Sequence, residues 1–310
     1  MRKHYQHMFE KWNETIIVNG IERHVEIRWD EVFERYCRII DRVGLELTKQ
    51  EDFSEKIDEP CIFCSRERLA KFDEKFGVKQ IENDNAFLFP NINPYAKYSS
   101  VCAFKKHYIE VGEFSPELIQ SNLQLAIEYI NKVKKMDDSV RYASINWNYM
   151  MPAGASILHP HMQVVADAMP TTYMRKASNE KFEKYIDEEL KRERYIKRIG
   201  SIGLFVPFVP FGFNEVFGLI EEELEHAIEE IAKAVSSILS YYHSIGRNSF
   251  NFSLYYSMEN EFPLHFRMIT RQNMARYYRN DAMFFERLHF ETILERKPEE
   301  IAKEIKGFLI

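Results

Sequence analysis

Two stretches of the chain carry apolar side chains at the spacing of a helix with one buried face. The first stripe consists of Ile119, Leu123, Ala126, Ile127, Ile130 and Val133, and the second of Leu224, Ile228, Ile231, Val235 and Ile238. Each stripe predicts an amphipathic helix that packs against other structure. Ser115 followed by Pro116 is typical of a helix N-terminus, and Pro298 predicts a third helix over 298–306, ended by Gly307.

Short runs rich in β-branched and aromatic residues surround the first two helices. They predict strands at 86–89, 101–104, 140–147 and 158–165, and again at 204–209, 213–220, 249–257 and 264–269. The same order of elements in both halves indicates an internal duplication. We therefore expect an α+β fold of two fused repeats, each an antiparallel sheet with a long helix packed on it. The expected boundaries are an N-terminal extension over 1–60, a first repeat over 61–175 and a second over 176–310.

The remaining segments give weaker predictions. We expect a hairpin around residues 16–21, a helix near 29–43, and a solvated helix or connector over 175–198, which is rich in Lys and Glu. The aromatic runs at 205–217 and 277–290 are expected in the core or at a subunit interface, not at a stacking site.

Charge and cysteine content narrow the class of protein. A net charge of -6, with both signs interspersed, argues against non-specific binding to nucleic acid or anionic membranes. The first eight residues lack the apolar core of a signal peptide, and no run approaches the roughly 20 apolar residues of a membrane span. We therefore expect a cytoplasmic protein. Its four cysteines are too few for a disulfide scaffold and are expected to be thiols or metal ligands.

The richest motif runs from Gly154 to Gln163, with the sequence Gly-Ala-Ser-Ile-Leu-His-Pro-His-Met-Gln. Because side chains alternate along a strand, His159, His161 and Gln163 should share one face. Pro160 places that strand at a sheet edge or puts the proline at the first residues of the strand. The small residues at 152–156 would let backbone amides approach an anion.

A phosphate beside an imidazole suggests group transfer. Neutral imidazole attacks phosphorus and also leaves it again, which suits a two-step transfer. The alternative is that two neighbouring histidines are merely satisfied by backbone partners.

The pair Cys61 and Cys64 is compatible with redox chemistry, with zinc binding or with two small apolar side chains. Zinc takes four ligands in a tetrahedron, and His107 and His159 are the candidates to complete a Cys₂His₂ site. His107 could instead be a surface residue.

The motif Gly154-Ala155-Ser156-x-x-His159-Pro160-His161-x-Gln163 resembles the active site of the galactose-1-phosphate uridylyltransferase family, a branch of the histidine-triad superfamily. The resemblance covers residues 60–165 well. It implies that His161 becomes nucleotidylated and that Gln163 holds a non-bridging phosphoryl oxygen. Further implied roles are diphosphate contacts for Asn148, Gly154 and Ser156, ribose contacts for Asn83 and Asp84, and Zn²⁺ ligation by Cys61, Cys64, His107 and His159. Asn83 and Asp84 could alternatively be only a turn signal.

Two departures from the family pattern are visible. The N-terminal arginines that help hold the sugar 1-phosphate in the family are not recognisable here, so the acceptor stays open. The second half has His265-Phe266-Arg267 in place of paired histidines, so we predict no second metal.

The leading hypothesis is a UDP-sugar:hexose-1-phosphate uridylyltransferase of galactose metabolism. It would use a nucleoside diphosphate sugar and a phosphorylated acceptor, and would form a homodimer as family members commonly do. The alternatives are an adenylyl-transferring phosphorylase, acting on an ADP-sugar or dinucleoside polyphosphate with phosphate as acceptor, and a zinc-stabilised nucleotide-binding protein without turnover. A hydrolase is disfavoured because the Gln163 amide cannot protonate a leaving group.

Overall fold

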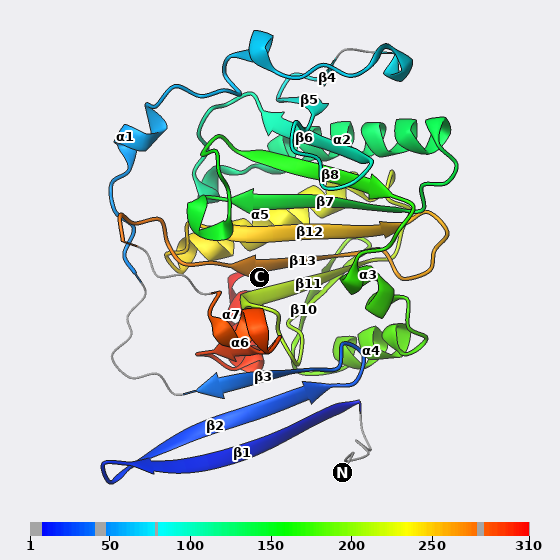
Figure 1. The fold of residues 1–310 in the computed structure, drawn as a ribbon. Helices are drawn as coiled ribbons and strands as arrows, with labels where there is room; N and C mark the ends of the chain where they lie inside the picture. Colours follow the sequence, from blue (N-terminus) through cyan, green and yellow to red (C-terminus); the bar gives the residue numbers. More distant parts are fainter. Residues whose placement is uncertain (1–7, 41–47, 78–79, 278–281, 310) are drawn as a thin grey trace.

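The computed structural model describes residues 8–40, 48–77, 80–277 and 282–309. Its largest element is a ten-stranded antiparallel sheet (Figure 1). The strands across it are, in order, β4 (Ile81–Glu82), β5 (Ala86–Pro90), β6 (Tyr98–Phe104), β8 (His161–Asp167), β7 (Tyr142–Tyr149), β12 (Phe250–Ser257), β13 (His265–Thr270), β11 (Phe213–Ile220), β10 (Ile202–Phe205) and β9 (Tyr195–Ile199).

The strand order confirms the duplication. Counted inward from either edge, each half contributes its first three strands in chain order, then its fifth, then its fourth. The two halves meet where β7 pairs with β12 along their whole length. The sheet is therefore one continuous unit built from two equivalent repeats, as the recurring order of elements predicts.

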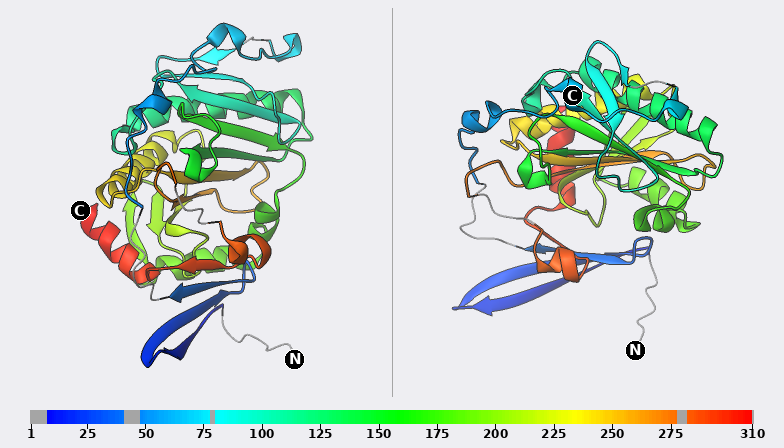
Figure 2. Two further views of the ribbon diagram at one scale, coloured as in Figure 1. Left: turned by 60° about the vertical axis from the view of Figure 1, so that its left-hand side comes forward. Right: turned by 45° about the horizontal axis from the view of Figure 1, so that its top comes forward.

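Two long helices, α2 (Pro116–Met136) and α5 (Ile228–Ser244), contact each other and cover one face of this sheet (Figures 1 and 2). All six residues of the first predicted stripe are buried in α2. The hydroxyl of Ser115 accepts a hydrogen bond from the amide of Leu118, so the predicted N-cap is confirmed. The second helix starts four residues later than its stripe, because Leu224 packs from the preceding loop.

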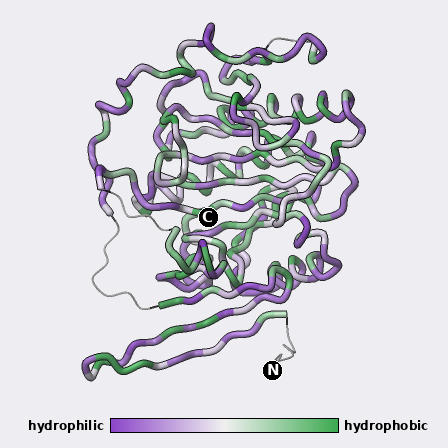
Figure 3. The backbone as a smooth tube through the Cα atoms, viewed as in Figure 1, coloured by the Kyte–Doolittle hydropathy of each residue, from purple (hydrophilic) through white to green (hydrophobic). Residues whose placement is uncertain are grey.

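The N-terminal segment forms a separate small sheet. Its strands are β1 (Phe9–Val18), β2 (Ile21–Asp30) and β3 (Arg35–Ile40), and the C-terminal strand β14 (Thr292–Leu294) joins it in parallel with β3. The predicted hairpin is confirmed, with a two-residue turn at Asn19 and Gly20, both at positive φ. Its tip is hydrophobic and projects from the molecule (Figures 2 and 3).

The helix predicted near 29–43 is wrong for residues 29–40, and 41–43 lie outside the described residues. Trp29, Val32 and Phe33 have helical spacing, but a carboxylate oxygen of Asp30 accepts from the amide of Phe33 at 2.7 Å and the chain reverses there. The strand β2 was hard to recognise in the sequence because charged residues occupy some of its inward positions. Arg28 and Asp30 are both almost fully buried.

The remaining elements complete the two layers. They are the helices α1 (Ser54–Ile57), α3 (Thr172–Ala177), α4 (Lys181–Leu190), α6 (Phe284–Leu288) and α7 (Pro298–Phe308), with short 3-10 turns at Arg66–Arg68, Glu74–Phe76, Val111–Glu113 and Met151–Ala153. The connector over 175–198 is not simply solvated, since α4 buries Phe182, Tyr185 and Ile186. Gly307 lies inside α7 instead of ending it. None of the helices in the described ranges combines the length and apolar content that a bilayer crossing requires.

Candidate active site

His161 is the first residue of β8, a strand in the interior of the first repeat, between β6 and β7. The edge position suggested by Pro160 is wrong, and the second reading of the proline is right, because Pro160 directly precedes the strand. His159 consequently lies ahead of β8, while His161 and the half-buried Gln163 point to the sheet face opposite α2. The carbonyl of Pro160 accepts a hydrogen bond from the amide of Phe104, which holds the segment before β8 against the end of β6.

The ring of His161 is held in a defined orientation. Its Nδ1 lies 2.8 Å from the carbonyl oxygen of His159, and because a carbonyl only accepts, Nδ1 carries the proton. Among the described residues, Nε2 has no hydrogen-bond partner, so it presents a lone pair. The Phe63 ring packs edge-on against His161 at 5.1 Å between centroids. Burial lowers the pKa of His161, which keeps the imidazole neutral and nucleophilic.

The four predicted metal ligands lie together although they come from three separate segments. Their ligand atoms all fall within 4.8 Å of one another. Nδ1 of His159 is 3.5 Å from the Cys61 sulfur and 3.3 Å from Nδ1 of His107, and the Cys64 sulfur is 3.2 Å from Nδ1 of His107. Two thiols and two imidazoles at this spacing can hold a metal ion.

Backbone carbonyls orient both histidines of this cluster. Nε2 of His159 donates to the carbonyl of Phe104 at 2.6 Å, and Nε2 of His107 donates to that of Ile57 at 2.8 Å. Each ring is thereby left with its Nδ1 lone pair facing the cluster, the arrangement usual for metal-bound histidines. Burial lowers the pKa of His159 to about 4, so its imidazole is neutral near pH 7. Phe63, between the two cysteines, contacts both His159 and His161 and links the cluster to the proposed nucleophile.

The small-residue turn before the histidines is closed by its own backbone hydrogen bonds. The amides of Ala153 and Ala155 donate to the carbonyl of Met150, and that of Gly154 donates to Met151, so these three amides are already used within the turn. Gly154 is exposed with φ +90° and lies beside the side-chain nitrogen of Asn148, 3.9 Å from where a Cβ would stand. Two side-chain donors beside this turn are the Asn148 amide and the exposed Ser156 hydroxyl.

A residue of the second repeat, missed in the sequence, orients Asn148. Asn251 stands opposite Asn148 across the β7–β12 pair. Its Nδ2 donates to Oδ1 of Asn148 at 2.7 Å and to the carbonyl of Ala153 at 2.8 Å. Nδ2 of Asn148 is thereby directed toward the turn. Arg271 in turn donates to Oδ1 of Asn251 at 2.8 Å, which fixes the orientation of that amide.

Asn83 and Asp84 have different surroundings in the structure. Oδ1 of Asn83 accepts from the amides of Asn85 and Ala86, and its Nδ2 donates to the carbonyl of Ser121. These bonds favour the alternative reading of Asn83 as a turn former. Asp84 is exposed, so its carboxylate is accessible to a ligand. The ribose contact therefore stays a prediction, with Asp84 as its better candidate.

The equivalent place in the second repeat is filled by side chains. His265 begins β13 as His161 begins β8, and its Nδ1 also lies against the carbonyl two residues earlier. Its Nε2, however, contacts the Tyr173 hydroxyl at 2.8 Å, and His265 is fully buried. Arg267, at the position equivalent to Gln163, pairs with the buried Glu215. In the second repeat, the imidazole Nε2 is therefore occupied, and an ion pair stands at the position equivalent to Gln163.

Comparisons with known proteins identify sequence relatives of this chain. No protein-family model matches the chain. An uncharacterised protein of Archaeoglobus fulgidus is 31% identical over an alignment of 319 residues, which covers 94% of this chain and 95% of that protein. An adenosine 5′-monophosphoramidase of Danio rerio is 27% identical over 152 residues, 48% of this chain and 90% of that protein.

Solved structures share the fold along nearly the whole chain. An ADP-glucose phosphorylase from Arabidopsis thaliana with bound ADP-glucose superposes with a TM-score of 0.68 at 15% identity, covering 91% of this chain and 98% of that one. A uridylyltransferase mutant superposes with a TM-score of 0.63 at 17% identity, covering 91% and 97%. The fold is that of the galactose-1-phosphate uridylyltransferase-like branch of the histidine-triad superfamily. The chain belongs to the same family as the A. fulgidus protein.

Proposed function

We propose that this chain is a nucleotidyltransferase that acts through a covalent nucleotidyl-His161 intermediate, with UDP-sugar:hexose-1-phosphate uridylyl transfer as its reaction. The observation that carries the proposal is the hydrogen bond between Nδ1 of His161 and the carbonyl of His159, which leaves Nε2 as a free nucleophile. A histidine serving only structure would be expected to satisfy both ring nitrogens, as His265 does.

The transfer proceeds in two displacements. Nε2 of His161 attacks the phosphorus that bears the nucleoside, a P–N bond forms, and the P–O bond to the hexose 1-phosphate breaks. The hexose 1-phosphate leaves with the bridging oxygen and the electron pair, and the ring carries a positive charge that the carbonyl of His159 stabilises. A phosphate oxygen of the acceptor then attacks the same phosphorus, and the P–N bond breaks to return neutral His161.

No proton has to move in either step, because a phosphate ester leaves as a stable anion. This fits Gln163, whose amide can donate a hydrogen bond to a non-bridging oxygen but cannot supply a proton. Nδ2 of Asn148 and the hydroxyl of Ser156 contact the diphosphate in this scheme, with Gly154 leaving room beside them, and Asp84 binds the ribose.

Isotope exchange between a nucleotide sugar and its own sugar 1-phosphate tests this function. A double-displacement enzyme exchanges the two without any second acceptor, whereas a nucleotide-binding protein without turnover does not. An adenylyl-transferring phosphorylase is the second candidate, since a protein of this fold is described as an ADP-glucose phosphorylase. It would exchange ADP-glucose with glucose 1-phosphate and leave UDP-glucose unchanged.

We propose Zn²⁺ as the ion of the Cys₂His₂ cluster. With Zn–N about 2.05 Å and Zn–S about 2.3 Å, a tetrahedron has N–N edges of about 3.3 Å and N–S edges of about 3.6 Å. The 3.3 Å between the two Nδ1 atoms and the 3.5 and 3.6 Å from Nδ1 of His159 to the two sulfurs match those edges, and the 3.2 Å from Cys64 to His107 is somewhat shorter. Bound there, the ion would fix the segment that leads into β8 and so position His161.

Removing one ligand of this cluster is expected to abolish metal binding. The wild-type protein, purified without chelator, should contain about one zinc per chain by elemental analysis, and Cys61→Ala should contain less than about a tenth of that. Cys102→Ala is the control, because this thiol is buried against Asn122 away from the cluster and its loss should leave zinc unchanged. Wild-type protein free of zinc would overturn the assignment.

Asn251 is expected to affect transfer without touching the substrate. Asn251→Ala frees the Asn148 amide and should lower the exchange rate on the order of tenfold. Asn251→Asp should lower it further, by about 100-fold, because the carboxylate attracts Nδ2 of Asn148 and turns that donor away from the phosphate. If Asn251 only stabilises the fold, the isosteric Asp variant should be the milder of the two. Ser253→Ala is the matched control, since its hydroxyl donates to Asn146 instead of Asn148.

We also propose that two chains associate, as the resemblance implies. The tip of the β1–β2 hairpin supports this, because Ile16, Ile17, Val18 and Ile21 are about half exposed or more and form an apolar end on a projecting arm.

A further inference from the structure

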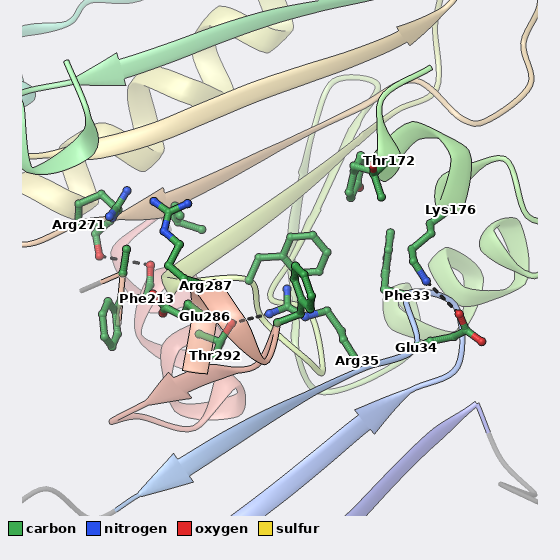
Figure 4. Close-up of a pocket in the computed structure, with 17 residues that line it drawn as sticks. Phe33, Glu34, Arg35, Thr172, Lys176, Phe213, Arg271, Glu286, Arg287 and Thr292 are labelled. Atoms are coloured by element: carbon green, nitrogen blue, oxygen red, sulfur yellow. Dashed lines mark hydrogen bonds and ion pairs between the residues drawn. The ribbon is translucent and has the colours of Figure 1, made fainter. Parts of the chain in front are cut away.

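A cavity of about 520 Å³ lies between the N-terminal segment and the second repeat, away from the histidine cluster (Figure 4). Its walls come from the turn between β2 and β3, from α3, from the start of β11, from the end of β13 and from α6. None of the predicted site residues lines it. Its volume is in the range of cavities that bind small molecules, roughly 300–1,000 Å³.

The charged residues of this cavity are mainly cationic. Four cationic side chains line it, against two carboxylates. Lys176 and Glu34 form an ion pair at 3.0 Å. Arg35, Arg271 and Arg287 are the other three cationic residues.

The guanidinium group of Arg35 is only partly satisfied by hydrogen bonds. One guanidinium nitrogen donates to Thr292, but its Nε is buried without a partner in the described part of the chain. Burial first, and then the nearby positive charge of Arg267, lower the pKa of Arg35 below its ordinary value. An anion in the cavity would relieve this unfavourable environment.

The apolar lining of the cavity is aromatic. Phe33, stacked on Tyr173 at 5.2 Å, and Phe211, whose ring lies 4.1 Å below the Arg35 guanidinium, line one part of it. Phe290 lines another part, with 75% of its surface exposed. Phe290 also has a φ of +57°, a conformation that bulky residues rarely adopt. A strained backbone that displays an aromatic ring to solvent at a cavity favours a binding role.

We propose that this cavity binds a nucleoside phosphate, with the base against the exposed ring of Phe290 and the phosphate against Arg35 and Arg287. The arginines supply the charge and the bidentate donors that a phosphate prefers, and the Phe290 ring supplies flat apolar surface for a planar base. From the sequence we expected the aromatic runs in the core or at a subunit interface. Phe205 and Phe217 are indeed buried in the core, whereas Phe211 and Phe290 line the cavity.

Equilibrium dialysis of the full-length protein against AMP and against UMP tests this site. We expect a binding equivalent that Arg287→Glu weakens at least tenfold. Arg287 is exposed on α6, so its replacement leaves the core untouched. Lys134→Glu is the matched control, with the same change of charge on exposed surface of α2, across the sheet, and it should bind as the wild type does. Ribose 5-phosphate should bind at least tenfold more weakly than either nucleotide, because it lacks the base.

The same titration on His161→Ala separates this site from the active site. The Arg287-dependent equivalent should persist there, so a failure of covalent transfer would not remove it. Wild-type binding by Arg287→Glu, or ribose 5-phosphate binding as tightly as AMP and UMP, would overturn the proposal.

Discussion

Replacing His161 by alanine is expected to lower the exchange between a nucleotide sugar and its sugar 1-phosphate by about 10⁴-fold or more. A loss of this size is typical when the nucleophile of a covalent mechanism is removed, because the remaining groups still bind the substrate but cannot form the intermediate. The fold should survive, since the interactions of the His161 side chain are one hydrogen bond to a carbonyl and the contact with Phe63.

His243→Ala is the control for this variant. His243 lies at the end of α5 with about half of its side chain exposed, and its removal should leave the exchange within about twofold of the wild type. If His161→Ala retained more than about a tenth of the wild-type exchange, another residue would have to carry the nucleotide and the assignment of the nucleophile would be wrong.

Arg267→Leu is expected to destabilise the protein by about 3–5 kcal/mol, measured as the free energy of unfolding in urea. Glu215 is fully buried, and its carboxylate is paired with Arg267 and accepts from the amide of Phe211. Burial alone would lower the pKa of the Arg267 guanidinium, but Glu215 raises it above its ordinary value. Removing the cation leaves an uncompensated charge in the interior.

Two comparisons show whether this cost comes from the stranded carboxylate. The double variant Arg267→Leu with Glu215→Leu should recover most of the stability, because replacing both members of a buried pair by apolar residues is often close to neutral. The exposed pair of Arg192 and Glu188 on α4 provides the surface reference, where Arg192→Ala should cost less than about 0.5 kcal/mol. A loss from Arg267→Leu no larger than this reference would contradict a structural role for the pair.

Much of the fold could be predicted from the sequence, because the large sheet and its helices are amphipathic. The stripe in α2 and the alternation at the start of β12 have regular spacing, and β5 and β11 are short, almost continuously buried runs. The small N-terminal sheet was mispredicted in part because inward positions of β2 hold Arg28 and Asp30. One partner of Arg28 is Glu299, which lies 271 residues away in the chain.

The sequence predicted those residues of the candidate site that are close in sequence or match a known motif. Cys61, Cys64, His107 and His159 were grouped by residue type and resemblance, and the fold brings their ligand atoms together. Asn251 was not found, because its role depends on the pairing of β7 with β12. The available signal was the alternation of polar residues at 251 and 253, which mirrors 146 and 148 on the partner strand.

The turn before the histidines shows that composition does not predict which backbone amides stay free. Its small residues were expected to offer backbone amides to a phosphate, but three of those amides close the turn itself. Composition indicates that a chain can bend closely there, and it does not show which donors remain after the bend is made. The side chain of Asn148, held by Asn251, takes over that role in the proposed site.

The intact mass of the protein shows whether His161 carries a nucleotide covalently. The protein is incubated separately with UDP-glucose, ADP-glucose and diadenosine tetraphosphate, and its mass is then measured. With at least one donor, we expect the mass to increase by one nucleoside monophosphate less one water. The increase should be absent in His161→Ala, and its size identifies the base. An unchanged mass with every donor, under conditions in which the isotope exchange proceeds, would contradict the covalent intermediate.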